Sequence, residues 1–146
     1  MLKLPLTYTG TDGKQKTRDF YFNLTKGEIA EIQLTLPGGL EGFAEHIGDD
    51  PDVEPEEVVR IFKELIVKSY GKRTAEGKFI KDPRFTQEFA ASDAYSELFL
   101  KFINNENNFT ENFLTGIMEM TLVDASKLMT EQKVAEATEP EIEDSL

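Results

Sequence analysis

The chain has 146 residues, a formal net charge of −12 and no cysteine. This length fits one domain, and the missing thiols exclude disulfides, thiolate metal sites and cysteine nucleophiles. No segment approaches the ~20 apolar residues of a membrane helix, and the opening MLKLPLTY is unlike a secretory signal. We therefore expect a cytoplasmic protein without membrane contact.

The charge is divided unevenly along the chain. Residues 41–57 hold eight acidic side chains and no Lys or Arg, and residues 121–146 hold seven acidic side chains against two lysines. Between these segments, residues 60–84 carry eight basic side chains against three acidic ones. Such segmentation favours oriented association with a partner, although ordinary solvated helix faces give the same pattern.

The N-terminal segment predicts a β-hairpin. In residues 2–8, Leu2, Leu4, Leu6 and Tyr8 alternate with Lys3, Pro5 and Thr7, and an Asp-Gly pair typical of hairpin turns follows at residues 12–13. Alternation resumes over residues 17–24. It places Phe20 and Phe22 on one face, which we assign to the core, and Tyr21 on the opposite face.

Helical periodicity then predicts a series of about six helices. Thr25 and Glu28 fit a capping box for the first helix, and Pro55 suits the first turn of the third. The apolar stripe of the third helix extends to Tyr70, and Gly71 is expected to cap its C-terminus. A short extended piece is expected at residues 78–80. The later helices are marked by Phe85, Phe89, Tyr95, Leu98, Phe99, Phe102, Ile103, Phe109, Phe113 and Ile117.

Together these elements predict an α+β, mainly α, fold: an N-terminal β-hairpin followed by a small bundle of about six helices. We assign one globular domain to residues 1–120. Residues 121–146 are expected to form an acidic, largely disordered tail, because they combine low hydrophobicity with high charge. A weak helix through Leu122, Leu128 and Val134 is the alternative for part of that tail.

The sequence indicates no catalytic residue, no cofactor site and no metal site. Residues 71–79 resemble a phosphate-binding loop, but they do not match its motif. Five residues separate the glycines where the motif has four, and Phe79 stands where a Ser or Thr hydroxyl is required. The acidic run at residues 49–54 lacks the glycine and the bidentate glutamate of a calcium loop. His46, the single histidine, has no nucleophile that the sequence places beside it. The negative net charge also argues against a nucleic-acid partner.

Three stretches, in the order RDFYFNLTKGEIAEIQL, FKELIVKSYGKRTAEGKFIKD and SDAYSELFLKFI, are followed by NFLTGI. Together they resemble the tail assembly chaperones of long-tailed phages. The likeness extends over residues 2–117, and the acidic ending departs from it. The resemblance implies a non-catalytic protein of the host cell cytoplasm that binds the tape measure protein, keeps it soluble and recruits tail tube subunits. Self-association is left open.

For the partner-binding surface we select aromatic residues of the last two predicted helices. Phe99, Phe102, Phe109 and Phe113 are expected to line an exposed apolar groove for tape measure helices, with core packing as the alternative for each ring. Two other functions remain as alternatives. One is a small structural adaptor protein retained in the virion, and the other is an acidic inhibitor that mimics the charge of DNA.

Overall fold

The computed structural model describes residues 1–36, 38–47 and 54–128. The elements follow the order β1 (Leu2–Thr9), β2 (Gln15–Phe22), α1 (Lys26–Thr35), α2 (Gly39–His46), α3 (Pro55–Ser69), β3 (Tyr70–Arg73), β4 (Phe79–Ile80), α4 (Pro83–Ala90), α5 (Asp93–Asn104), a 3-10 turn (Glu106–Asn108) and α6 (Phe109–Met118). A further helix covers 122–128. The expected α+β, mainly helical fold with an N-terminal hairpin is confirmed.

The first two strands form the predicted hairpin. They pair antiparallel over their whole length, from Leu2 opposite Phe22 to Thr9 opposite Gln15. The Gly10 N–H donates to the Lys14 carbonyl at 2.8 Å, and Gly13 takes a left-handed backbone conformation with φ 78°. A glycine suits this position because a side chain there would be strained.

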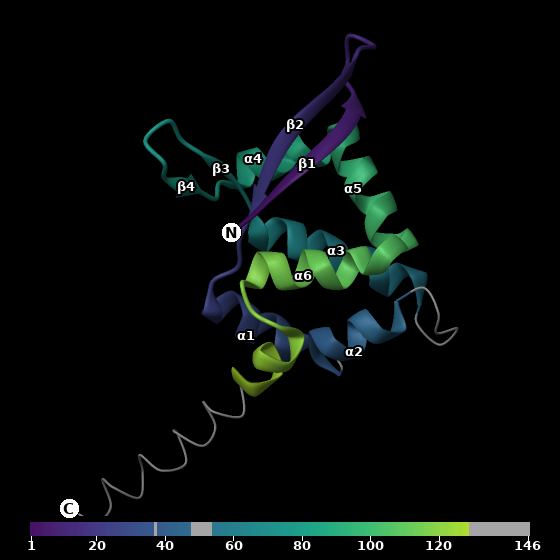
Figure 1. Cartoon of the computed structure of the whole chain (residues 1–146), viewed down its shortest axis with the longest axis vertical. Helices are drawn as coiled ribbons and strands as arrows, with labels where there is room; N and C mark the ends of the chain where they lie inside the picture. The colour runs from purple at the N-terminus through teal and green to yellow at the C-terminus, as the bar shows by residue number, and fades with distance from the viewer. Residues whose placement is uncertain (37, 48–53, 129–146) are drawn as a thin grey trace, which may run out of the picture.

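The four strands make one sheet in the order β1-β2-β3-β4, and the helices lie to one side and below it (Figure 1). In that view α4 and α5 lie beside the sheet, and α3 and α6 cross the middle of the molecule. The opposite end is formed by α1, α2 and the 122–128 helix. The sheet therefore occupies one end of a mostly helical molecule.

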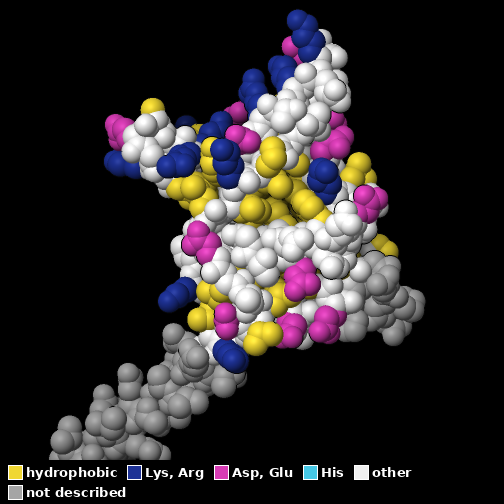
Figure 2. All heavy atoms as spheres, in the orientation of Figure 1, with side chains coloured by type: hydrophobic (Ala, Val, Ile, Leu, Met, Phe, Trp, Pro, Cys, Tyr) yellow, Lys and Arg dark blue, Asp and Glu magenta, His cyan; other side chains and the backbone are white. Residues whose placement is uncertain are grey.

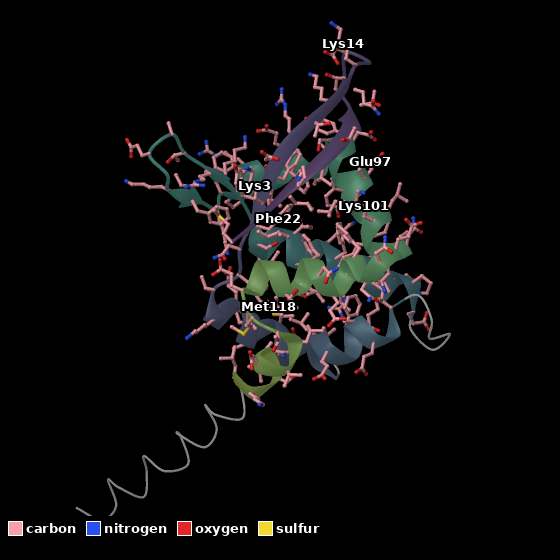
Figure 3. The ribbon with its side chains drawn as sticks, in the orientation of Figure 1. Lys3, Lys14, Phe22, Glu97, Lys101 and Met118 are labelled. Atoms are coloured by element: carbon pink, nitrogen blue, oxygen red, sulfur yellow. The ribbon has the colours of Figure 1, made fainter. Side chains whose placement is uncertain are left out.

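The alternation predicted for β2 is confirmed. Phe22 is fully buried and Phe20 is partly buried against the core, whereas Tyr21 is partly buried but does not belong to the core cluster. Phe22 stands at the junction between the hairpin and the helices (Figure 3). Its ring centroid lies 5.4 Å from that of Phe113 on α6, which joins the sheet to the helical part.

The C-terminal end of α3 differs from the prediction. The helix ends at Ser69 with Tyr70 as its C-cap, and Tyr70 and Gly71 begin β3, where they pair with Phe22 and Tyr21 of β2. Tyr70 is drawn into the core, where its ring stacks on Phe89 at 4.5 Å and burial raises its pKa to about 12. A Cβ on Gly71 would lie 2.6 Å from the Phe79 ring and 2.6 Å from the Ile80 carbonyl. Gly71 is thus needed for close strand packing rather than for helix capping.

The packed part of the chain continues beyond the boundary expected at residue 120. In the 122–128 helix, Leu122 is 8% exposed, Ala125 is fully buried and Leu128 packs partly against the core. The spacing of these three residues places them on one helix face. Residues 129–146 of the expected tail lie outside the described residues.

We predict that Leu122→Ala lowers the free energy of unfolding by about 2–3 kcal/mol, because it leaves a cavity against the core. Val123→Ala is the matched control. Val123 is 51% exposed, and its truncation should change stability by less than ~0.5 kcal/mol. Chemical denaturation followed by circular dichroism measures both variants. Equal effects of the two substitutions would show that the 122–128 helix does not pack as described.

Candidate partner-binding groove

An apolar groove lies between α3 and α4 and has a volume of ≈ 810 Å³. Grooves of this size with mostly apolar walls are the usual docking places for ligands and for side chains of partner helices. The lining residues are Glu28, Lys63, Ile66, Val67, Lys68, Lys81, Asp82, Pro83, Thr86, Gln87, Ala90 and Tyr95.

The α3 side of the groove presents an apolar residue to solvent. The main apolar stripe of this helix points inward, and Phe62, Leu65 and Ile66 are buried. Val67 lies just off the stripe and is 61% exposed. An exposed valine beside a buried isoleucine extends the apolar surface of the core into the groove.

The α4 side is held in place at both ends of that helix. At its start, Asp82 accepts a hydrogen bond from the Arg84 N–H at 2.9 Å, and Pro83 occupies the first helical position. At its end, the buried Phe89 stacks on Tyr70. Because Phe89 anchors α4 from the side that faces the core, the exposed Ala90 is left to form part of the groove wall.

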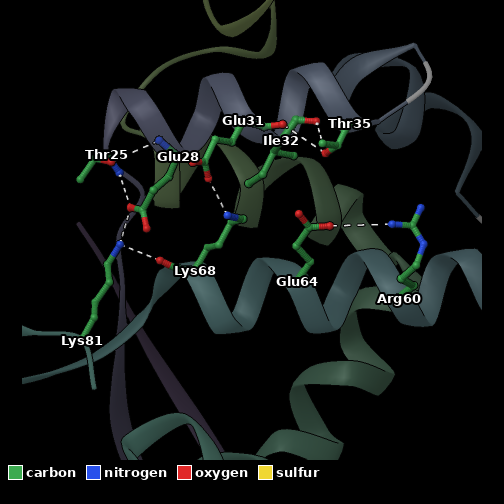
Figure 4. Close-up of polar contacts among 9 residues, drawn as sticks. All are labelled: Thr25, Glu28, Glu31, Ile32, Thr35, Arg60, Glu64, Lys68 and Lys81. Carbon is green, nitrogen blue, oxygen red and sulfur yellow. Dashed lines mark hydrogen bonds and ion pairs between the residues drawn. The ribbon is translucent and has the colours of Figure 1, made fainter. Parts of the chain in front are cut away.

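A polar cluster joins three separate segments at one end of the groove (Figure 4). The Glu28 Oε1 atom accepts hydrogen bonds from the Thr25 N–H at 2.9 Å and from Lys81 Nζ at 2.5 Å. Lys81 also donates to the Lys68 carbonyl at 2.6 Å, which is one of the last carbonyls of α3. The predicted capping box of Thr25 and Glu28 is confirmed, and Lys81 links it to the end of α3.

The charges of this cluster support one another. Burial raises the pKa of Glu28, but the hydrogen bonds from Lys81 and Thr25 together outweigh burial and hold that pKa below its ordinary value. The hydrogen bond between Lys68 Nζ and Glu31 Oε2, at 2.6 Å, raises the pKa of Lys68 against a smaller effect of burial. Both groups are therefore charged at neutral pH, and the end of the groove is closed by paired charges.

The groove belongs to the basic part of the molecule. Lys63, Lys68 and Lys81 line it, against Glu28 and Asp82. Figure 2 shows Lys and Arg side chains gathered over the hairpin and the β3–β4 segment, whereas the opposite end carries more Asp and Glu than Lys and Arg. The segmentation seen along the sequence thus persists as a separation in space.

The four phenylalanines expected to bind a partner do not line this groove. Phe102 is fully buried and Phe113 is 2% exposed, so both belong to the core. Phe99 and Phe109 are partly buried against the core and keep part of their surface accessible. Helical spacing identified the apolar faces of α5 and α6 correctly, but it did not show that other elements cover these faces. Most of the residues that line the groove come from the basic stretch at residues 60–84.

The described residues contain no group of three or more His, Asp or Glu side chains placed to hold a metal ion. Residues 49–53 of the rejected calcium loop lie outside the part of the chain that the structure describes, as does the side chain of His46. Within the described ranges, no helix combines the length and the apolar character needed to cross a membrane.

We predict that Glu28→Gln lowers stability by roughly 1 kcal/mol at neutral pH, because glutamine keeps the capping box but loses the charge paired with Lys81. A lowered pKa means that the stabilisation is fully present above the unfolded-state value of 4.5 and is lost as the pH falls through the lower folded-state value. The difference between the two proteins should therefore vanish in strong acid.

Thermal unfolding from neutral pH to strong acid measures the stability difference between Glu28→Gln and the unchanged protein. Glu31→Gln is the control. Glu31 is 64% exposed, and its ion pair with Lys68 should contribute less. A stability difference for Glu28→Gln that is independent of pH would contradict the proposed role of charge.

A family model described as phage tail assembly chaperone matches residues 1–145. No curated protein and no solved structure matches the chain. The matched span includes the acidic ending, which the resemblance of separate stretches had not covered. Tail assembly chaperones are non-catalytic, which agrees with the sequence-based prediction that the protein is not an enzyme. The chain therefore belongs to the phage tail assembly chaperone family.

Proposed function

We propose that this chaperone acts in the host cell cytoplasm, where it binds the tape measure protein, keeps it soluble and recruits tail tube subunits. Family membership supports a tail protein as the partner. The observation that carries the proposal is the apolar groove between α3 and α4, with Val67 61% exposed at its wall. An apolar surface of this kind stabilises a complex only when the partner covers it with apolar side chains of its own, because apolar surface is then removed from water on both proteins.

The occupant that best fits the groove is one face of an amphipathic helix. An α-helix is about 10–12 Å wide with its side chains, and it presents apolar residues at positions i, i+3, i+4 and i+7. A tape measure protein that has not yet been assembled would expose such faces to water along its length. Covering them prevents their association with one another, which is the physical basis of the proposed chaperone activity.

We place this contact at the groove rather than at the four phenylalanines chosen from the sequence. Phe102 and Phe113 are buried, and they would reach a partner only if α5 and α6 moved away from the core. Phe99 and Phe109 remain candidates for a peripheral contact, since both are only partly buried. A substitution of Leu100, which is 48% exposed and follows Phe99 on α5, tests that second surface.

The acidic end of the molecule contributes to solubility in this proposal. Chaperone molecules bound side by side along one tape measure protein would repel each other at short range if their acidic ends were close. This repulsion opposes aggregation of tape measure proteins that chaperone molecules cover only in part. The tail tube subunit would then bind a surface that the tape measure protein leaves free.

We predict that Val67→Glu abolishes co-purification of the co-expressed tape measure protein and returns it to the insoluble fraction. A charge at the centre of an apolar contact must be desolvated, and losing such an anchor costs about 2 kcal/mol or more, a loss of roughly thirtyfold in affinity. Leu34→Glu is the matched control, because Leu34 is 67% exposed on α1 and lies outside the groove lining.

Circular dichroism and thermal unfolding must show that both variants fold, as expected for exposed positions. Equal loss of binding in Val67→Glu and Leu34→Glu would contradict the groove. Loss in Leu100→Glu alone would assign the contact to the α5 surface instead. A tape measure protein that is equally soluble without this chain would contradict the chaperone function itself.

A further inference from the structure

Strand β2 has a free edge beside the point where β3 turns away. Only Tyr21 and Phe22 of β2 pair with β3, opposite Gly71 and Tyr70. Beyond these pairs the β3–β4 segment diverges from the hairpin, and in Figure 1 the two form the arms of a wedge with α4 drawn behind it. Within the described residues, the part of β2 from Gln15 to Asp19 has a strand partner on the β1 side alone.

The direction of the backbone groups follows from two hydrogen bonds. The Asn23 N–H donates to the Ser69 carbonyl at 2.8 Å, so odd-numbered residues here point toward the β3 side. The Gly10 N–H donates to the Lys14 carbonyl, so even-numbered residues point toward β1. Because backbone direction alternates along a strand, the N–H and C=O groups of Gln15, Thr17 and Asp19 all point into the wedge. These three residues are exposed.

The opposite edge of the hairpin is better protected. Pro5 has no N–H to offer on β1, and the Thr9 N–H already lies 3.4 Å from an Asp93 carboxylate oxygen of α5. Proline and covering helices are the usual means by which proteins block an edge strand. On the β2 edge, residues 15–19 include no proline, and α4 reaches the space beside them through Glu88 and Phe89.

The wedge also contains a hollow of ≈ 320 Å³ with unbalanced charge. Tyr70 and Phe89 belong to its lining, and so do Arg18, Lys72 and Arg73. Lys72 lies 3.3 Å from Glu88, and Asp19 lies 3.6 Å from Lys3, so these charges are paired. Arg18 and Arg73 form no ion pair with any residue that the structure describes. The hollow therefore offers two guanidinium groups next to unpaired backbone groups.

We propose that the free edge of β2 binds an extended, acidic segment of a partner protein by strand addition. The backbone of that segment pairs with Gln15, Thr17 and Asp19, and its carboxylates meet Arg18 and Arg73. Strand addition obtains affinity from the main chain and selectivity from the neighbouring side chains, which here select for negative charge. This site is separate from the groove between α3 and α4, and it does not depend on the identity of the groove's occupant.

The test is an NMR titration of the isotope-labelled full chain with three short, blocked peptides. The first alternates valine and glutamate, the second alternates valine and lysine, and the third is the valine–glutamate peptide N-methylated at every residue. The first peptide should shift the amide signals of Gln15, Thr17 and Asp19 and slow their hydrogen exchange. The other two should leave these signals unchanged, since one has the wrong charge and the other cannot donate backbone hydrogen bonds.

Two variants separate charge from folding. The double substitution Arg18→Glu and Arg73→Glu should weaken binding of the first peptide roughly tenfold, because two attractive contacts become repulsive. Lys14→Glu, at the tip of the hairpin (Figure 3), makes a charge change away from the hollow and should have a much smaller effect.

Equal binding of the N-methylated peptide would overturn strand addition, and the absence of shifts at the three β2 amides would overturn the site. Shifts of these amides that depend on chain concentration without any peptide would assign the edge to a second copy of the chain instead. Val67→Glu should bind the peptide normally, so failure at this edge and failure at the groove are distinguishable.

Discussion

The contact on which the rest of the structure depends is the packing of Phe22 between the hairpin and the helices. Its ring lies 5.4 Å from Phe113, 5.6 Å from Tyr70 and 6.0 Å from Phe89. Further ring pairs continue through Phe102 to Phe62 at 5.0 Å. A two-stranded hairpin is marginally stable alone, so its position is set by what its apolar face meets. Because Tyr70 and Phe89 also fix β3 and α4, the same aromatic cluster determines one wall of the groove and the angle at which β3 leaves β2.

Local signals in the sequence predicted the elements that depend on neighbouring residues. The hairpin alternation, the Asp-Gly turn and the capping box of Thr25 and Glu28 all appear in the structure. Prediction failed where tertiary contacts outweighed a local pattern. Tyr70 continues the helical spacing of α3, but pairing with Phe22 and stacking on Phe89 place it in a strand. The weak helix predicted as an alternative for Leu122 and Leu128 is present over 122–128 with Leu122 and Ala125 buried, whereas Val134 lies outside the described residues. The binding surface was the hardest to predict, because periodicity gives the apolar face of a helix but does not show whether another helix covers it.

The distribution of charge connects the two surfaces that we propose for partners. The groove and the β2 edge both lie in the basic part of the molecule, and the acidic α2 end lies away from them. The groove is apolar, and the charges at one end of it are paired with each other, which suits the apolar face of a partner helix. The β2 edge combines backbone groups and guanidinium groups that have no partner among the described residues, which suits an extended acidic segment. In our proposal, these two different modes of recognition would let one small chaperone hold two tail components at once, as recruitment of a second subunit would require.

Site-specific photo-cross-linking during co-expression tests the central claim, that the groove between α3 and α4 holds the tape measure protein. A photoreactive residue would replace Val67 in the groove wall, Leu34 on α1, or Leu100 on α5 in three separate experiments. This placement of the tape measure protein predicts a cross-link from position 67 and none from position 34. A cross-link from position 100 without one from position 67 would contradict it, because the partner would then lie on α5 rather than in the groove.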